Sequence, residues 1–351
     1  MAPLVYYLPN VTDVTSVTPY NHAIAVADLA TESTLLTYPA APPAAVEAAF
    51  DRVVVLRSGL PPVRAWRASR IADRLLDAED GVYLTTFHYA PALSGYLSDR
   101  RWVLDVYDDP MQYVYNRDSR VQPITVRGLL SLLDRADRAV HTVHPSTPRT
   151  FSGDVRFAAN GADVEGLEPS FDVGDTLRLV HASSHDAGLA VTLEALAGLE
   201  AGARLDVYGD VPERHAARAD ALGVTNDVTF HGPTDHGRVR RAVERADVGL
   251  CLLGDRPDWR YAHPIRIGEF LAAGTVPLAS DLPGVRDLTR DAGVLVSPTS
   301  IAVESALARL ADCADLAAQK RRARERAEYI PWHEERRWFA RQVLGLDQYP
   351  S

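Results

Sequence analysis

Lysine and cysteine are almost absent from this sequence of 351 residues. Of its 37 basic residues only Lys320 is a lysine, and its two cysteines, Cys251 and Cys313, lie in apolar stretches. So few cysteines exclude a disulfide framework and a cysteine-rich metal site. Abundant arginine without lysine indicates a GC-rich genome. The excess of aspartate over glutamate is also typical of salt-loving hosts, whose proteins keep acidic surfaces hydrated, although GC bias alone explains much of it.

Long apolar runs and a surplus of positive charge are absent as well. No stretch of about 18 apolar residues occurs that could cross a membrane, and the N-terminus lacks the basic start and apolar core of a signal peptide. The formal net charge of −10 disfavours nucleic acid as a partner, because binding a phosphate chain requires a basic face. We therefore expect a cytoplasmic protein that binds no nucleic acid.

The standard dinucleotide fingerprint is missing too. No Gly-x-Gly-x-x-Gly follows the first predicted strand, Leu4 to Leu8. Strand-like and helix-like segments nevertheless alternate along the whole chain, which predicts an α/β protein with parallel sheets covered on both faces. The length is sufficient for two such domains, each with its own core.

The segment from Tyr261 to Ser280 combines a loop, a short helix and a buried strand. His263-Pro264 ends the loop, helix-compatible apolar spacing runs from Ile265 to Ala273, and Gly274 stands where a C-cap glycine belongs. The start of such a helix points backbone N–H groups and the positive end of the helix dipole at its surroundings. A phosphate is therefore favoured there.

Four residues of this segment are candidates for binding. A phosphate beside Pro264, Ile265 and Arg266 would meet both the helix start and the guanidinium group. Glu269, one turn further along, can accept hydrogen bonds from sugar hydroxyls. The alternative, from spacing alone, is an ordinary helix with one exposed arginine and one exposed glutamate.

The same segment resembles the signature of glycosyltransferase family 4, the glycosyl transferases group 1. The family pattern is roughly Pro-x-Lys-x-x-Glu-x-x-Ala-x-Gly-x-Pro-Val-x-x-Ser/Thr-Asp. The matching positions here are Pro264, Arg266, Glu269, Ala272, Gly274, Pro277, Ser280 and Asp281. Arginine replaces the family's lysine, and Tyr261 stands where a first glutamate is common, although many members lack it. Asn160-Gly161 followed by Asp163 resembles a second family element, Asn-Gly-Val-Asp.

The resemblance implies the GT-B fold, an α/β architecture of two facing Rossmann-like domains. It places an acceptor-side domain at residues 1–168 and a nucleotide-sugar-binding domain at residues 169–332. Tyr329-Ile-Pro-Trp332 resembles the kinked element after which the last helix, at about 333–351, crosses back to the first domain. The basic run from Lys320 to Arg324 is interpreted as a solvated helix end, or as a contact with an anionic membrane.

Carboxylates after the strand Trp102 to Val106 are candidates for catalysis. Asp108 and Asp109 are adjacent, and close like charges raise one pKa, so one of them could be a general base. They could equally be a helix N-cap and its solvated neighbour. With Asp105 they are similar to the Tyr-Asp-x-x-Asp-Asp element of some GT-B transferases. His88 follows another strand, where it either contacts sugar or acceptor or caps a neighbouring helix.

The family's phosphate cradle is incomplete in this sequence. Members usually carry an arginine after the first strand of the second domain and a lysine at the next helix, but the segment from His181 to Gly188 contains neither. Ser183, Ser184 and backbone N–H groups would then hold phosphate oxygens beside Arg266. The remaining donor-side candidates are, by resemblance, Gly209, Asp210 and Gly232.

The resemblance implies a transferase that moves a sugar from a UDP-, GDP- or other nucleotide-sugar to a glycan or lipid-linked acceptor. Retention of configuration is expected from the family. No metal or other cofactor is expected, because the helix dipole and Arg266 supply positive charge. Two alternatives remain: a degenerate, non-catalytic nucleotide- or sugar-binding subunit, favoured by the missing arginine and lysine, and a nucleotide-sugar epimerase. A lipid-linked acceptor would imply peripheral contact with the inner face of the membrane.

Overall fold

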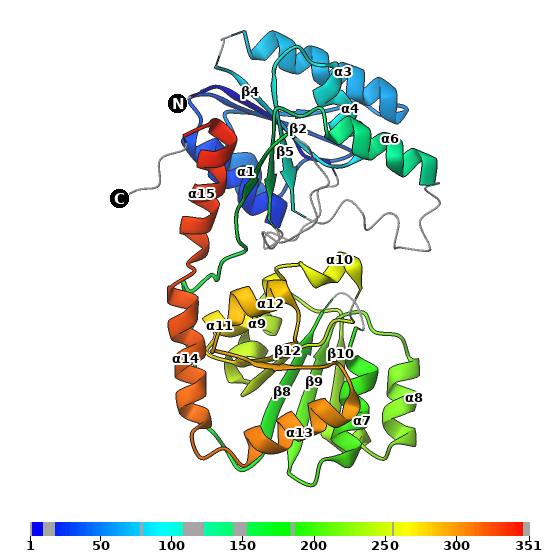
Figure 1. Ribbon diagram of the computed structural model, residues 1–351, viewed down its shortest axis with the longest axis vertical. Helices are drawn as coiled ribbons and strands as arrows, with labels where there is room; N and C mark the ends of the chain where they lie inside the picture. Colours follow the sequence, from blue (N-terminus) through cyan, green and yellow to red (C-terminus); the bar gives the residue numbers. More distant parts are fainter. Residues whose placement is uncertain are drawn as a thin grey trace. The chain divides into compact units, whose positions relative to one another are not determined.

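The computed structural model describes residues 2–9, 18–77, 80–107, 123–142, 153–183, 187–254 and 256–346. The chain divides into two units, Met1–Ala159 with His333–Ser351 and Asn160–Trp332. Each unit has its own parallel sheet with helices on both faces (Figure 1). The predicted two-domain α/β architecture is therefore confirmed. No helix in the described residues is long and apolar enough to span a bilayer.

The first unit is built on a sheet of seven parallel strands in the order β3-β2-β1-β4-β5-β6-β7. Their bounds are β1 Leu4–Tyr7, β2 Ser33–Thr37, β3 Arg52–Val55, β4 Val82–Thr86, β5 Arg101–Val106, β6 Arg138–His141 and β7 Asp154–Phe157. The central strands are short apolar runs that are buried on both faces, as parallel strands covered by helices require. The winding direction reverses between β1 and β4, and open α/β sheets place ligands outside the carboxyl ends of the strands at such a point.

Helices from both ends of the chain complete the core of the first unit. The helices α1 Thr18–Leu29, α2 Ala44–Ala49 and α15 Trp332–Leu344 pack on one face of the sheet. The opposite face is covered by α3 Pro61–Leu75, α4 Tyr89–Leu97 and α6 Pro123–Leu133. Phe339 of α15 is fully buried and stacks on His22 of α1, with 3.6 Å between the ring centroids. The predicted return of the last helix to the first domain is confirmed.

The second unit contains six parallel strands in the order β10-β9-β8-β11-β12-β13. Their bounds are β8 Leu177–Ala182, β9 Ala203–Tyr208, β10 Val228–Gly232, β11 Val248–Cys251, β12 Val276–Ser280 and β13 Val294–Val296. Here the winding direction reverses between β8 and β11. The loops that follow these two strands therefore flank the ligand-binding position of an open α/β sheet.

Two groups of helices cover the second sheet. One face carries α7 Leu189–Gly198, α8 Arg214–Ala221 and α13 Ser300–Ala311, and a short 3-10 turn, Thr225–Asp227, precedes β10. The other face carries α9 His236–Arg245, α11 Ile265–Ala272, α12 Pro283–Thr289 and α14 Leu316–Glu328. The short helix α10 Pro257–Arg260 lies in the loop between β11 and α11.

Residues 160–168, which the sequence placed in the first domain, group with the second unit. The backbone explains this boundary. Ala162 donates its N–H to the carbonyl of Ile330 at 2.7 Å and accepts the N–H of Trp332 at 2.9 Å. The segment that leaves the first unit is therefore joined by a short β-bridge to the segment that returns to it.

The single lysine of the chain is buried, so the prediction that the whole run from Lys320 to Arg324 is solvated was wrong. Lys320 is fully buried in α14, with Nζ 2.9 Å from Oδ1 of Asp247. Asp247 also accepts two hydrogen bonds from the guanidinium of Arg178. Burial alone would raise the pKa of Asp247, but these two cations outweigh it and hold that pKa below its usual range. Only Arg321 and Arg322 of the run are exposed.

Candidate functional site

The start of α11 lies on the loop that leaves β11 at the switch point of the second sheet. Pro264 is the N-cap of this helix, and its carbonyl accepts the N–H of Ile267 at 3.0 Å. The N–H groups of Ile265 and Arg266 precede that first bond and therefore have no partner within the helix. Ser280, at the end of β12, is buried and bonds both the N–H and the carbonyl of Leu253, which fixes the loop after β11.

Arg266 and Glu269 form an ion pair on the first turn of α11. Nη1 of Arg266 lies 2.6 Å from Oε2 of Glu269, and both side chains are about three-quarters buried, at 29% and 23% exposure. The contact lies within ion-pair distance but not along a hydrogen-bond direction, so the buried Oε2 makes no hydrogen bond in the described residues. This carboxylate oxygen has capacity to accept a hydroxyl donor.

His236 completes the cluster from a different helix. It is the first residue of α9, and its Nε2 lies 3.5 Å from Oε1 of Glu269. Asp235, the N-cap of α9, accepts the backbone N–H of Arg238 at 2.9 Å and so fixes the helix start that carries His236. Burial alone would raise the pKa of Glu269, but Arg266 and His236 hold it below its usual range. Glu269 is therefore an anion at neutral pH.

Sequence reasoning did not identify His236, because the residue lies 33 positions before Glu269 and matches no motif. Its only local signal was its position directly after an aspartate that could cap a helix. That signal predicts a helix start, but it does not reveal which other helix the histidine contacts.

The Asn160-Gly161 element packs against the same helix. Nδ2 of Asn160 donates to the carbonyl of His263 at 2.6 Å, just before the N-cap. A Cβ atom on Gly268 would lie 2.5 Å from the carbonyl oxygen of Gly161, so α11 approaches this segment as closely as a glycine permits. A Cβ atom on Gly161 would in turn lie 2.6 Å from Cα of Trp332. Three segments that resemble family motifs therefore meet around the start of α11.

The structure also brings together three of the predicted cradle residues. Ser183, Gly209 and Gly232 follow or end neighbouring strands β8, β9 and β10. Gly209 donates its N–H to the carbonyl of Gly232 at 3.1 Å. Only glycine fits there, because φ is 122° and a Cβ atom would lie 1.9 Å from the carbonyl oxygen of Ser183. The N–H of Ser183 donates to the carbonyl of Tyr208 at 3.2 Å, so both N–H groups are engaged by backbone carbonyls.

The other predicted donor-side residues are placed as follows. Asp210 is exposed directly after Gly209. Ser184 lies outside the described residues, and so do His185 and Asp186. On the described side of this loop, Gly188 adopts a left-handed conformation with φ of 77° at the start of α7, where a Cβ atom would lie 2.4 Å from the Cβ of Leu252. The start of α7 therefore packs against Leu252, the residue that follows β11.

In the first unit, His88 stands directly before α4 in a partly buried position. Its Nδ1 lies 3.1 Å from Oγ1 of Thr86 and 3.4 Å from the hydroxyl of Tyr107, and its ring stacks on Phe87. Burial lowers the pKa of His88 to about 4, against the opposing charge of Asp105. His88 is therefore a neutral imidazole at physiological pH. Asp108 and Asp109 lie outside the described residues.

Asp105 is the centre of a buried polar group that the sequence did not reveal. The carboxylate accepts the hydroxyl of Tyr6 at 2.6 Å and contacts Nδ1 of His22 at 3.0 Å. All three residues are at most 3% exposed, and His22 in turn stacks on Phe339. This arrangement joins β1, β5, α1 and α15, so in the described structure Asp105 holds the core of the unit together.

Residues 177–313 match the family model of the glycosyl transferases group 1. None of the curated proteins is similar enough in sequence to match. The match covers β8 to α13 and includes Arg266, Glu269 and His236.

Solved structures of glycosyltransferases resemble the whole chain. HepE from Anabaena, in complex with UDP and glucose, has a TM-score of 0.76 at 14% identity, with 99% of this chain and 100% of that chain covered. Sucrose-phosphate synthase from Thermosynechococcus elongatus has a TM-score of 0.69 at 17% identity, with 99% of both chains covered. WaaG, a glycosyltransferase of lipopolysaccharide biosynthesis, has a TM-score of 0.68 at 16% identity, with 97% and 100% covered. The GT-B fold predicted from the sequence is confirmed.

Proposed function

We propose that this chain is a nucleotide-sugar glycosyltransferase that binds its donor at the start of α11 and transfers the sugar to a glycan or lipid-linked acceptor. The group 1 match over residues 177–313 and the GT-B fold support this proposal. The observation that supports this site best is the cluster of Arg266, Glu269 and His236 on a helix start at the sheet's switch point. A cation, a helix N-terminus and a carboxylate within one turn suit a diphosphate attached to a ribose.

Each group has a distinct role in this proposal. Arg266 and the N–H groups of Ile265 and Arg266 bind the diphosphate, and they stabilise the negative charge that develops on the leaving group. Glu269, ionised and with an oxygen that makes no hydrogen bond in the described residues, accepts the ribose hydroxyls. His236 orients this carboxylate from α9.

A uridine diphosphate sugar is the first donor to test, because the similar structure of HepE contains UDP and glucose. A guanosine diphosphate sugar is the second. We propose that no metal takes part, since Arg266 and the helix dipole supply the positive charge, and that configuration is retained, on the family resemblance. Transfer that persists in EDTA and a product with the anomeric configuration of the donor, observed by NMR, would support both points.

Calorimetric titration with UDP and GDP tests the site. Replacing Arg266 with alanine should weaken binding about 10- to 100-fold, because it removes charge-assisted hydrogen bonds to phosphate. The matched control is Arg309→Ala, an arginine on α13 of the same unit, which should bind like the wild type. Equal losses in both variants, or no loss in Arg266→Ala, would refute the assignment.

A double-mutant cycle tests the contact between Glu269 and the ribose. Glu269→Ala should weaken UDP binding, but it should have little effect on 2′,3′-dideoxy-UDP, which lacks the hydroxyls that the carboxylate accepts. Additive losses for the two changes would place the ribose elsewhere.

The rival candidate is a non-catalytic nucleotide-binding subunit. It is favoured by the missing arginine and lysine in the loop after β8 and by the engagement of the Ser183 N–H with Tyr208. Such a subunit would bind UDP or GDP in calorimetry. It would neither transfer nor hydrolyse the corresponding nucleotide-sugar, whereas the proposed enzyme releases nucleoside diphosphate in the presence of acceptor.

A further inference from the structure

An apolar strand, β3, ends the sheet of the first unit on one side. Within the described residues it pairs with β2 alone. The strands β1, β2 and β4 are fully buried, whereas Val55 of β3 is 45% exposed and Val53 and Val54 are only partly buried. An edge strand of exposed valines is a template on which another strand can pair.

The backbone of β3 directs hydrogen-bonding groups away from the sheet. Leu56, directly after the strand, donates its N–H to the carbonyl of Thr37 at 2.8 Å, so its backbone groups face β2. Because this direction alternates from one strand residue to the next, the N–H and carbonyl groups of Val53 and Val55 point outward. The described residues offer these outward groups no partner. A strand that paired here would satisfy them.

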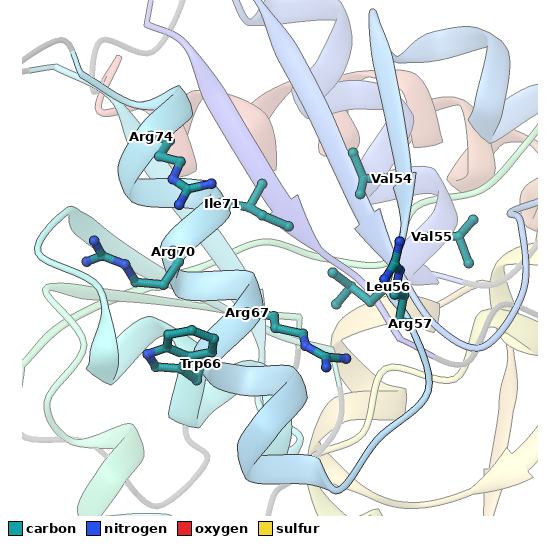
Figure 2. Close-up of a pocket in the computed structure, with 9 residues that line it drawn as sticks. All are labelled: Val54, Val55, Leu56, Arg57, Trp66, Arg67, Arg70, Ile71 and Arg74. Carbon is teal, nitrogen blue, oxygen red and sulfur yellow. The ribbon is translucent and has the colours of Figure 1, made fainter.

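A hollow of about 360 Å³ lies beside this strand, between β3 and helix α3. Val54 and Leu56 line it from the strand and Ile71 lines it from the helix (Figure 2). Val55 lines it too, although Figure 2 shows its side chain on the opposite side of β3 from Val54. Consecutive strand residues point to opposite faces, so a hollow that both valines line reaches the edge of the strand. Its apolar floor can therefore take a side chain of a segment that pairs with that edge.

Arginines from both elements surround the hollow. They are Arg57, Arg67, Arg70 and Arg74. Of the four, only Arg70 approaches a carboxylate within the described residues, with Nη1 3.5 Å from Oδ2 of Asp73. Arg67 donates to the carbonyl of Ser58 at 3.4 Å, which leaves its charge uncompensated. On a chain of net charge −10, such a cluster of cations attracts anions.

We propose that the β3 edge, formed by Val53 to Arg57 and the hollow beside them, binds an extended acidic segment of a partner protein as an additional strand. The backbone of the segment bonds the outward groups of Val53 and Val55, its carboxylates bind the arginines, and an apolar side chain enters the hollow.

The charge and the backbone of the β3 edge select this occupant. A second copy of the chain that paired through the same edge would bring the arginines of both copies together, and their repulsion opposes such a dimer. A small anion or an acidic glycan would bind the arginines, but it would leave the outward backbone groups of β3 without a strand. The proposal does not depend on the donor site, and its test requires no sugar transfer.

A pool of labelled heptapeptides that alternate Asp or Glu with Val, Leu or Phe tests the charge of the β3 edge. In fluorescence anisotropy, the full-length protein should bind this pool about 10-fold more tightly than a pool with lysine at the acidic positions. Arg57→Gln/Arg74→Gln, at two exposed positions, should weaken binding of the acidic pool about 10-fold. The matched control, Arg321→Gln/Arg322→Gln, removes the same charge from exposed residues of α14 and should bind like the wild type. Equal binding of the two pools, or an equal loss in the two variants, would overturn the proposal.

Backbone methylation of the peptides separates strand pairing from attraction between charges. An acidic pool that is methylated on every backbone nitrogen keeps its carboxylates but cannot pair as a strand, so it should not bind. Hydrogen exchange at the amides of Val53 and Val55 should slow when the unmethylated pool binds the wild type. If the methylated pool binds as well as its parent, if exchange at these amides is unchanged, or if polygalacturonate binds while the acidic peptides do not, the arginines serve a different anion and the proposal is wrong.

Discussion

Burial determines the charge of individual histidines in the first unit. His141, at the end of β6, is 3% exposed, and burial lowers its pKa to about 4. His88 has a pKa of about 4 for the same main reason. Both imidazoles are neutral at physiological pH, because a positive charge on a buried ring would lose its contact with water.

The burial of His141 predicts that the folded protein becomes less stable in mild acid. The pKa of His141 is about 4 in the folded protein and about 6.5 in the unfolded chain, so between these values the unfolded chain holds the extra proton. The free energy of unfolding should therefore decrease as the pH falls from about 6.5 to about 4, by up to about 3 kcal/mol for this residue. The free energy of unfolding of His141→Leu, measured with urea, should change less between these pH values than that of the wild type. His333→Leu, at an exposed position on α15, should keep the wild-type profile, and identical profiles for all three proteins would contradict this explanation.

At the scale of elements, α11 is positioned by close backbone contacts. Gly268 lies against the carbonyl of Gly161, and Asn160 bonds the carbonyl just before the helix. These contacts explain why two segments separated by about a hundred residues both resemble family motifs: they form one structural unit that presents Arg266 and Glu269.

A pair of glycine substitutions tests this contact. Gly268→Ala would place a Cβ atom 2.5 Å from a backbone oxygen, so α11 must move, at a cost of about 2 kcal/mol in the free energy of unfolding, and UDP binding should weaken. Gly128→Ala, at an exposed position on α6 with no atom within 4 Å, should instead stabilise the protein by about 0.5–1 kcal/mol through helix propensity. Urea unfolding of both variants measures the difference, and a change of the same sign in both would argue against a tight contact at α11.

At the scale of the whole molecule, the two units have separate cores. The core of the first unit includes Phe339 and Val343 from the end of the chain, whereas α13 and α14 belong to the second unit. The stability of each sheet therefore depends on a different set of helices.

Native-state hydrogen exchange can measure this separation. Phe339→Ala removes a fully buried ring that stacks on His22, and should cost the first unit about 3–5 kcal/mol. Amide protection should then decrease in β1 to β6 and stay unchanged in β8 to β13. Leu307→Ala, in the core of the second unit, should produce the opposite pattern. Loss of protection in both sheets from either change would show that the units unfold together.

Much of the fold could be predicted from the chain. Short apolar runs alternate with amphipathic segments. The spacing of apolar residues within each segment predicts a strand or a helix, regardless of how these elements later assemble. The helix at Ile265, its N-cap proline and the glycine that follows its C-cap are local features, which is why Arg266 and Glu269 were identified correctly as neighbours on one helix turn. The helix α4 after His88 was not predicted, because its residues lack a clear apolar period.

The sequence by itself therefore determined the alternation of elements, the two-domain α/β class and the helix that carries the candidate site, because hydrophobic period, caps and turns act over a few residues. The tertiary structure alone decided that Lys320 is buried on Asp247, that His236 reaches Glu269 and that arginines of α3 line a hollow beside β3. Burial and partners at long sequence separation depend on how strands and helices pack, and no local pattern contains that information.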